Sequence, residues 1–195
     1  MQSNQAVIST DQLSQQLASV KVLDCSAAMG RAPEDDHRAN FHRTHIQGAL
    51  FVDMDYFKEM RSDLPFTMPS EKQFVDTMKR LNVKLTDTVV CYDTGAMGFF
   101  AHRAAWMIHA MGHPDVRVLD GGFAKWVKEG KPVGGKDEGA GDFGYKLNPD
   151  RIKNFDEMKA FADSSDQKPF QVIDARGPPQ FEAGNISGAV NIPFS

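Results

Sequence analysis

Residues 89–110 constrain the fold of this chain more than any other part of the sequence. Residues 89–92 are typical of a short buried strand, a loop with two glycines follows, and apolar residues then recur at helical spacing. A strand, a loop and a helix in this order direct several backbone N–H groups, and the positive end of the helix dipole, toward one point. We therefore predict an anion cradle here, with Asp93 at the tip of the strand.

The predicted strands and helices alternate along the first two thirds of the chain. We expect strands at residues 21–25, 50–53, 89–92 and 116–119, and helices at 10–20, 71–81 and 123–129, with a further helix after the loop within residues 89–110. Residues 28–43 indicate a surface loop, and residues 56–69 an irregular segment with a helical turn. Alternation of this kind predicts an α/β fold, a doubly wound domain with a central, mostly parallel sheet flanked by helices.

The last third of the sequence repeats parts of the first. Residues 131–144 contain five glycines and little to bury, which is typical of a linker. A capped helix follows at 154–162, residues 170–174 copy 20–24, and residues 181–194 copy 41–54. We predict a first domain at 1–133, a linker at 134–150 and the beginning of a second domain at 151–195. Because no second copy of residues 89–110 is present, we expect a fragment or a truncated chain.

Composition excludes several classes of function. The net charge is −4 and no basic run is present, so we expect no nucleic-acid partner. No apolar stretch reaches membrane-spanning length, and the first residues lack a signal sequence, so we expect no membrane partner and no secretion. We predict a monomer in the cytoplasm, with the mitochondrion as the alternative compartment.

The cysteines, tryptophans and two of the histidines are interpreted mainly as structural. Cys25 and Cys91 lie in strand-like contexts, which favours core packing, although Cys25 is the better candidate for a reactive thiol. Trp106 and Trp126 lie at helical positions and are predicted to be core residues. His109 and His113 are predicted to be a helix cap and a surface residue.

Several motifs together resemble the tandem-domain rhodaneses, the thiosulfate and 3-mercaptopyruvate sulfurtransferases. They are LDCS, HIQGALFVDMD, PSEKQFVDTMKRLNV, VVCYDTGAMGFFAHRAAWM and VRVLDGGFAKWVKEGKPV, followed by VIDAR and AGNISGAVNIPF at the start of the second copy. The resemblance implies small doubly wound domains, of which the first normally lacks the nucleophile and the second carries a cysteine in its loop. It implies no cofactor and no metal.

The mechanism implied by the resemblance uses a cysteine thiolate at the strand tip. The helix N-terminus lowers the pKa of that thiol, which takes sulfur from thiosulfate or 3-mercaptopyruvate as a persulfide and passes it to cyanide or another thiol. Asp93 holds the matching position in this chain, so we expect the chain alone to have no sulfurtransferase activity. The resemblance assigns these substrate-binding positions: Asp93, Thr94, Gly95, Ala96, Met97, Gly98 and Arg176.

The sequence differs from the usual pattern of this family at two places. Gln180 stands where the family often has an arginine, and residues 65–69 lack a histidine found in mercaptopyruvate-type members. Arg176 either binds the substrate anion or holds its loop through a salt bridge. We expect the first domain to form one wall of a cleft between the domains, through Asp24, residues 93–98 and residues 53–55.

Other functions fit the sequence less well. Asp93-Thr94-Gly95 matches the aspartic-protease signature, but only one copy exists and a helix follows it. The glycine loop lacks the lysine of a Walker motif, the third glycine of a dinucleotide site, and the cysteine and arginine of a phosphatase. Histidines and acidic residues cluster as possible metal ligands at 35–45 (Asp35, Asp36, His37, His42 and His45), but we favour a solvated loop there. The remaining alternative is a non-catalytic rhodanese-like module that binds a partner or a small anion.

Overall fold

The computed structural model describes residues 6–27, 36–62, 64, 66–134, 149–164 and 170–194. These residues belong to two compact units, Met1–Asn148 and Pro149–Ser195, called unit 1 and unit 2 below. Residues 135–148 of the predicted linker lie outside the described residues, and its last two residues begin the short 3₁₀ helix η2 (Pro149–Arg151). The predicted domain boundaries therefore stay a prediction.

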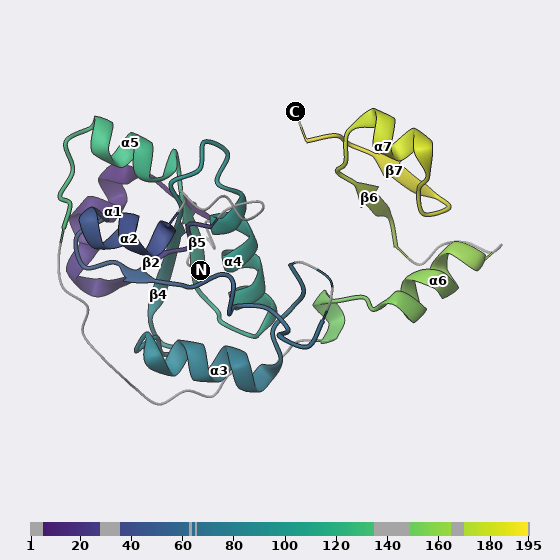
Figure 1. Cartoon of the computed structure of the whole chain (residues 1–195), viewed down its shortest axis with the longest axis horizontal. Helices are drawn as coiled ribbons and strands as arrows, with labels where there is room; N and C mark the ends of the chain where they lie inside the picture. The colour runs from purple at the N-terminus through teal and green to yellow at the C-terminus, as the bar shows by residue number, and fades with distance from the viewer. Residues whose placement is uncertain are drawn as a thin grey trace, which may run out of the picture. The chain divides into compact units, whose positions relative to one another are not determined.

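Unit 1 contains a parallel sheet of five strands in the order β1-β5-β4-β2-β3 (Figure 1). The strands are β1 (Val7–Ile8), β2 (Val20–Asp24), β3 (Leu50–Phe51), β4 (Thr88–Tyr92) and β5 (Val116–Leu119). All four strand pairs are parallel, and β4 at the centre is in register with β2 from Thr88 opposite Val20 to Tyr92 opposite Asp24. The predicted fold class is confirmed.

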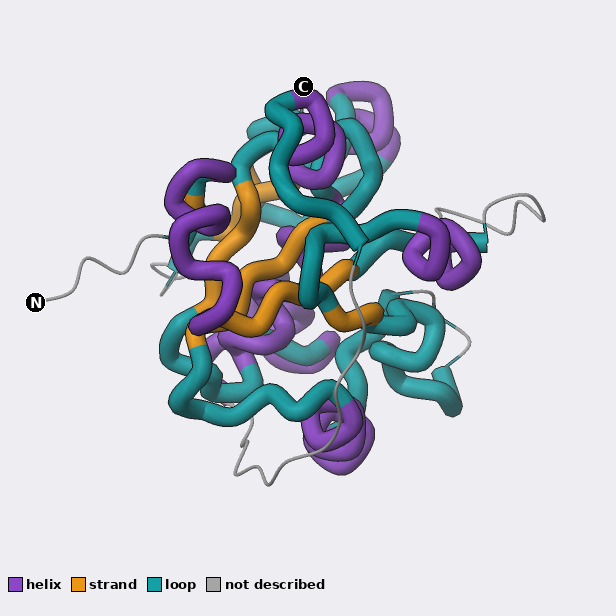
Figure 2. Tube along the Cα trace, turned by 90° about the vertical axis from the view of Figure 1, so that its left-hand side faces the viewer, coloured by secondary structure: helices purple, strands orange, loops and turns teal. Residues whose placement is uncertain are grey.

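Helices cover both faces of this sheet (Figure 2). They are α1 (Thr10–Gln16) with the 3₁₀ turn η1 (Leu17–Ser19), α2 (His37–Arg43), α3 (Glu71–Arg80), α4 (Phe99–Ala110) and α5 (Gly122–Lys128). Side chains of α3 and α4 share one core with Leu23 and Cys91, whereas side chains of α1, α2 and α5 share another with Val90 and Tyr92. Alternate residues of β2 and β4 therefore face two cores, as expected of strands buried on both sides.

Three expectations for unit 1 are wrong. Residues 37–43, predicted to lie in a surface loop, form α2, which begins at Asp36 because its side chain accepts the N–H of Ala39 (2.9 Å). Trp106 is exposed because it lies on the outer side of α4. His113 is buried, not at the surface. Its burial is compatible with a polar side chain because both ring nitrogens have backbone partners, the carbonyl of Lys84 and the N–H of Asp115. Residues 28–35 of the predicted loop lie outside the described residues.

Unit 2 is smaller and contains a two-stranded parallel sheet. Its remaining elements are α6 (Phe155–Asp163), β6 (Val172–Asp174), α7 (Pro178–Ala183) and β7 (Ala189–Asn191). The predicted helix after Asn154 is confirmed, since that side chain caps α6 in a reciprocal capping box with Glu157. In the part of the chain that the structure describes, no helix has the length and apolar character needed to cross a membrane.

Candidate functional site

Asp93 lies directly after β4, with its carboxylate under the loop that leads into α4. Its Oδ1 accepts the N–H of Gly95 (3.0 Å) and its Oδ2 accepts the N–H of Ala101 (2.9 Å), in the first turn of α4. Only 2% of Asp93 is exposed. The carboxylate therefore occupies the start of the helix and satisfies amides that have no partner within the helix.

Two opposing effects act on the ionisation of Asp93. Burial raises its pKa above the ordinary value for aspartate, and the Ala101 and Gly95 amides lower it by a smaller amount. Like-charge repulsion from Asp24 also raises the pKa. The positive end of α4 thus meets a carboxylate that ionises less readily than a free one.

A second set of hydrogen bonds joins the ends of β2 and β4. Oδ1 of Asp24 accepts the N–H of Ser26 (2.9 Å), and Oγ of Ser26 accepts the N–H of Thr94 (3.0 Å). Asp24 and Ser26 are both buried. Ser26 is not among the predicted site residues, although an Asp-x-Ser triplet at the end of a strand is a signal for this turn.

The backbone of Asp93 is fixed from the β5 side as well. Its carbonyl oxygen accepts the N–H of Phe123 (3.1 Å). Gly122 has a φ of +55°, and a Cβ there would lie 3.0 Å from the same carbonyl oxygen. A glycine is therefore required at position 122 for α5 to approach the tip of β4 this closely.

The loop residues that follow Asp93 lie at the surface. Thr94, Gly95, Ala96 and Met97 are exposed, and Gly98 begins α4 with a left-handed φ of 66°. The loop amides therefore do not all face one open site, because those of Gly95 and Ala101 are taken by Asp93. The predicted ring of amides is present, and the carboxylate of Asp93 occupies it.

The residues at the end of β3 form a separate turn. Oδ2 of Asp53 pairs with Arg38 (2.9 Å), and its Oδ1 accepts the N–H of Asp55 (3.2 Å). The ends of β3 and β2 are joined because the carbonyl of Asp24 accepts the N–H of Val52 (2.8 Å). The carboxyl edges of β3, β2 and β4 therefore carry three acidic residues, each with its own partner.

Neither cysteine is arranged as a nucleophile. Cys25 and Cys91 are both fully buried in the core beneath α4. Burial raises the pKa of the Cys25 thiol well above its ordinary value, and the thiol donates to the carbonyl of Leu23 (3.6 Å). A reactive thiol needs the opposite, an exposed position and a lowered pKa.

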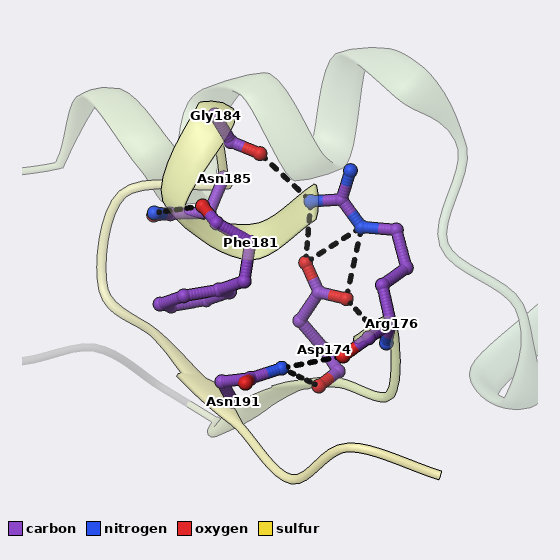
Figure 3. Close-up of polar contacts among 6 residues, drawn as sticks. All are labelled: Asp174, Arg176, Phe181, Gly184, Asn185 and Asn191. Carbon is purple, nitrogen blue, oxygen red and sulfur yellow. Dashed lines mark hydrogen bonds and ion pairs between the residues drawn. The ribbon is translucent and has the colours of Figure 1, made fainter. Parts of the chain in front are cut away.

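In unit 2, Arg176 forms a bidentate ion pair with Asp174 (Figure 3). Its Nε donates to both carboxylate oxygens (3.0 Å each), and its Nη2 donates to Oδ2 of Asp174 (2.6 Å) and to the carbonyl of Gly184 (2.8 Å). This pairing lowers the pKa of Asp174 and raises that of Arg176. Of the two roles left open for Arg176, the structure contains the salt bridge that holds the loop.

The predicted histidine cluster does not assemble as a metal site in the described residues. His37 and His42 lie on α2, whereas His45 lies beyond the end of the helix, stacked on Phe41 with ring centroids 4.1 Å apart. Within the ranges that the structure describes, no three histidine, cysteine or acidic side chains come together as metal ligands would. Asp35 lies outside those ranges.

The family model of the rhodanese-like domain matches residues 9–129, which contain the whole sheet from β2 to β5 and the loop at Asp93. The chain belongs to the rhodanese family. The matched residues of this rhodanese domain include Asp93 to Gly98, whereas Arg176 lies outside them.

Curated rhodanese relatives match most of the chain. Thiosulfate sulfurtransferase from Gallus gallus is 39% identical over 191 residues, which cover 91% of this chain and 64% of the relative. 3-Mercaptopyruvate sulfurtransferase from Mus musculus is 33% identical over 190 residues, covering 90% of this chain and 63% of the relative. The chain thus spans slightly less than two thirds of the length of these relatives.

Solved structures share the fold of this chain. The 3-mercaptopyruvate sulfurtransferase SseA from Escherichia coli superposes with a TM-score of 0.84 at 24% identity, covering 97% of this chain and 75% of that chain. Tum1 from Saccharomyces cerevisiae superposes with a TM-score of 0.76 at 26% identity, covering 92% of this chain and 63% of that chain. The rhodanese fold of the chain is therefore supported by sequence and by structure.

Proposed function

We propose that this chain serves rhodanese-type sulfur transfer, in which a cysteine persulfide carries sulfur from thiosulfate or 3-mercaptopyruvate to cyanide or another thiol. In that reaction a thiolate attacks the outer sulfur of thiosulfate, the S–S bond breaks, and sulfite leaves. The names of the curated relatives support the reaction class. The same proposal includes small-molecule sulfur donors and acceptors and no cofactor. It also includes a monomer located in the cytoplasm.

The observation that carries the proposal is the carboxylate of Asp93 at the strand tip. It lies within hydrogen-bond distance of amides at the start of α4, where the mechanism places a thiolate. A carboxylate oxygen cannot accept and release sulfane sulfur, so unit 1 is the silent partner in the reaction. The burial of Cys25 and Cys91 supports the same conclusion, and the reactive thiol must come from outside residues 1–195.

We further propose that the chain consists of a silent rhodanese domain at 1–133, a linker at 134–150 and the start of a duplicated domain at 151–195. The local geometry of the two copies supports duplication. Leu23 pairs with Leu50 in unit 1, and Ile173 pairs with Val190 at the matching positions of unit 2. Arg176 is then a loop-holding residue beside the substrate site of the second domain.

An assay of the purified 195-residue chain tests the proposal. We expect no thiocyanate from thiosulfate and cyanide, and no pyruvate from 3-mercaptopyruvate and a thiol, above the rate without protein. The thiosulfate sulfurtransferase of Gallus gallus, assayed under the same conditions, is the positive control. Thiocyanate release that disappears in Cys25→Ser or Cys91→Ser would contradict the proposal.

A second candidate is a non-catalytic module that binds a protein partner. Met97 and Phe99 favour it, because both are large apolar side chains that lie about half exposed beside the silent loop. A small anion at this loop is disfavoured, because Asp93 already fills the amides. Titration with thiosulfate, followed through the amide resonances of residues 94–98, should show no saturable shift.

A further inference from the structure

Two loops of unit 1 meet at the amino ends of β4 and β5, residues 81–87 and residues 111–115. His113 lies between these loops and is only 1% exposed. Its Nε2 lies 3.1 Å from the carbonyl oxygen of Lys84, and its Nδ1 lies 3.3 Å from the backbone nitrogen of Asp115. Because Asp93 follows the carboxyl end of β4, the contact between the loops is at the opposite edge of the same sheet.

The two partners of His113 determine where its ring carries a hydrogen. The carbonyl of Lys84 can only accept, so Nε2 donates to it, and the N–H of Asp115 can only donate, so Nδ1 accepts it. Both bonds exist together only in the neutral ring, because an imidazolium carries a hydrogen on each nitrogen. A proton added to Nδ1 would therefore face the N–H of Asp115 and break that bond.

The carboxylates near His113 are already engaged by other groups. Asp115 accepts two hydrogen bonds from Arg117 (2.8 Å each) and one from the hydroxyl of Thr88 (2.8 Å). Asp87 accepts a backbone N–H of its own loop (2.7 Å). An imidazolium at position 113 would have to compete with these partners for its counter-charge, in a place where water has little access.

Burial is the largest influence on the ionisation of His113, and it lowers the pKa of the ring below the ordinary value for histidine. The carbonyl of Lys84 and the charges of Asp115 and Asp87 raise the pKa by smaller amounts, and His109 on α4 lowers it further. The contribution of the neutral ring to stability is therefore full above the unfolded value near 6.5 and is lost as the pH falls toward the folded value.

We propose that His113 is a pH-sensitive latch, which joins the two loops when its ring is neutral and releases them when Nδ1 takes a proton from mildly acidic solvent. The loops separate while the sheet stays folded, because the strand pairing of β4 with β2 and β5 does not involve the ring. The amides around Asp93 lie beyond the far end of α4, a helix about 18 Å long. The latch is independent of the proposed sulfur transfer.

Amide hydrogen exchange of the full 195-residue chain tests the latch. After correction for the intrinsic rate, the protection of the Asp115 amide should fall several-fold between about pH 7 and pH 5. The ceiling is about 25-fold, the change in proton binding by an ordinary histidine over this interval. Exchange at Asp115 should also be insensitive to low concentrations of urea, because a local opening exposes little surface. If urea accelerates it as much as the exchange of the Cys25 amide, the opening is global and the proposal is overturned.

Variants identify the titrating group. His113→Gln keeps a donor and an acceptor but does not titrate, so the protection of the Asp115 amide should no longer depend on pH. His102→Gln is the matched control, since His102 is exposed on α4, and it should retain the full pH dependence. The proposal fails if His113→Gln retains the pH dependence, or if His109→Gln removes it while His113 is intact.

The ring resonances of the unsubstituted chain provide a second measurement, which needs no variant to fold. At neutral pH they should show the tautomer of His113 with its hydrogen on Nε2, and on titration a pKa below that of histidine in an unfolded peptide. The opposite tautomer, or a pKa at or above the ordinary value, would overturn the proposal.

Discussion

At the scale of single residues, Asp93 combines a structural cost with a structural benefit. Burial disfavours its charge, and the amides of Gly95 and Ala101 favour it. A thiolate at the same place would benefit from the same amides, which is why a strand tip beneath a helix start suits either anion. Under the proposed function, the same electrostatic environment serves chemistry when the strand tip carries a thiolate and helix capping when it carries a carboxylate.

Asp93→Ala should destabilise the chain by about 2 kcal/mol at neutral pH, because two backbone N–H groups lose their acceptor in a buried position. The loss should be larger in mild acid. The folded-state pKa of Asp93 is raised, so its contribution to stability is full below the unfolded value near 4 and declines as pH rises through the folded pKa. Urea unfolding of both proteins at about pH 4 and pH 7 measures this difference.

Asp76→Ala is the matched control for this experiment. Asp76 lies exposed on α3 in an ion pair with Lys72 (3.8 Å), so its removal should change the free energy of unfolding by less than about 0.5 kcal/mol. An effect of Asp93→Ala no greater than that of Asp76→Ala would contradict the capping role. A loss that grows as pH rises would contradict the direction of the pKa.

At the scale of elements, the start of α3 depends on a reciprocal capping box. Oγ of Ser70 accepts the N–H of Gln73 (3.3 Å), and Oε1 of Gln73 accepts the N–H of Ser70 (3.1 Å). Ser70→Ala should lower the free energy of unfolding by about 1 kcal/mol, whereas Ser70→Asp should retain most of it, since aspartate is an equally good cap. Thermal unfolding of the three proteins checks the ranking, and equal losses in both variants would exclude capping as the cause.

The elements predicted well are those whose signal is local. Ser70 before an amphipathic run predicts α3, and the run of apolar residues before Asp93 predicts β4. α2 is missed because it is short and highly charged, and only Phe41 marks its buried side. β1 is missed because two residues carry no periodicity, and its pairing with β5 is visible only in three dimensions.

The candidate site was predictable in part for the same reason. The position of Asp93 at the strand tip follows from the order of strand, loop and helix. The hydrogen bonds from Thr94 to Ser26 and from Phe123 to Asp93 join residues far apart in the sequence, so no local pattern indicates them. Trp106 shows how far the sequence predicts the burial of a single side chain. Neighbouring helical positions differ by about 100° in direction, so a small error in the assumed helix phase assigns an exposed residue to the core.

At the scale of the whole molecule, the two units differ in how much apolar surface they bury. Unit 1 contains two cores with many fully buried side chains, whereas Phe161 is the one hydrophobic residue of the described part of unit 2 that is classed as buried. Since apolar burial supplies most of the free energy of folding, unit 2 should open locally far more often than unit 1. Its backbone pairing alone cannot compensate, because an isolated pair of strands is marginal in water.

Amide hydrogen exchange should therefore separate the units. We expect the amides of β4 to exchange only through global unfolding, and those of β6 to exchange at least about a hundredfold faster, which corresponds to an opening free energy lower by about 3 kcal/mol. β3 and β7 are the matched comparison, because both are short edge strands at equivalent positions of their sheets. Leu50 in β3 is covered and Val190 in β7 is not, so β3 should be the better protected of the two. Equal protection of β3 and β7 would mean that the apolar face of unit 2 is covered, and would contradict the lower stability expected of unit 2.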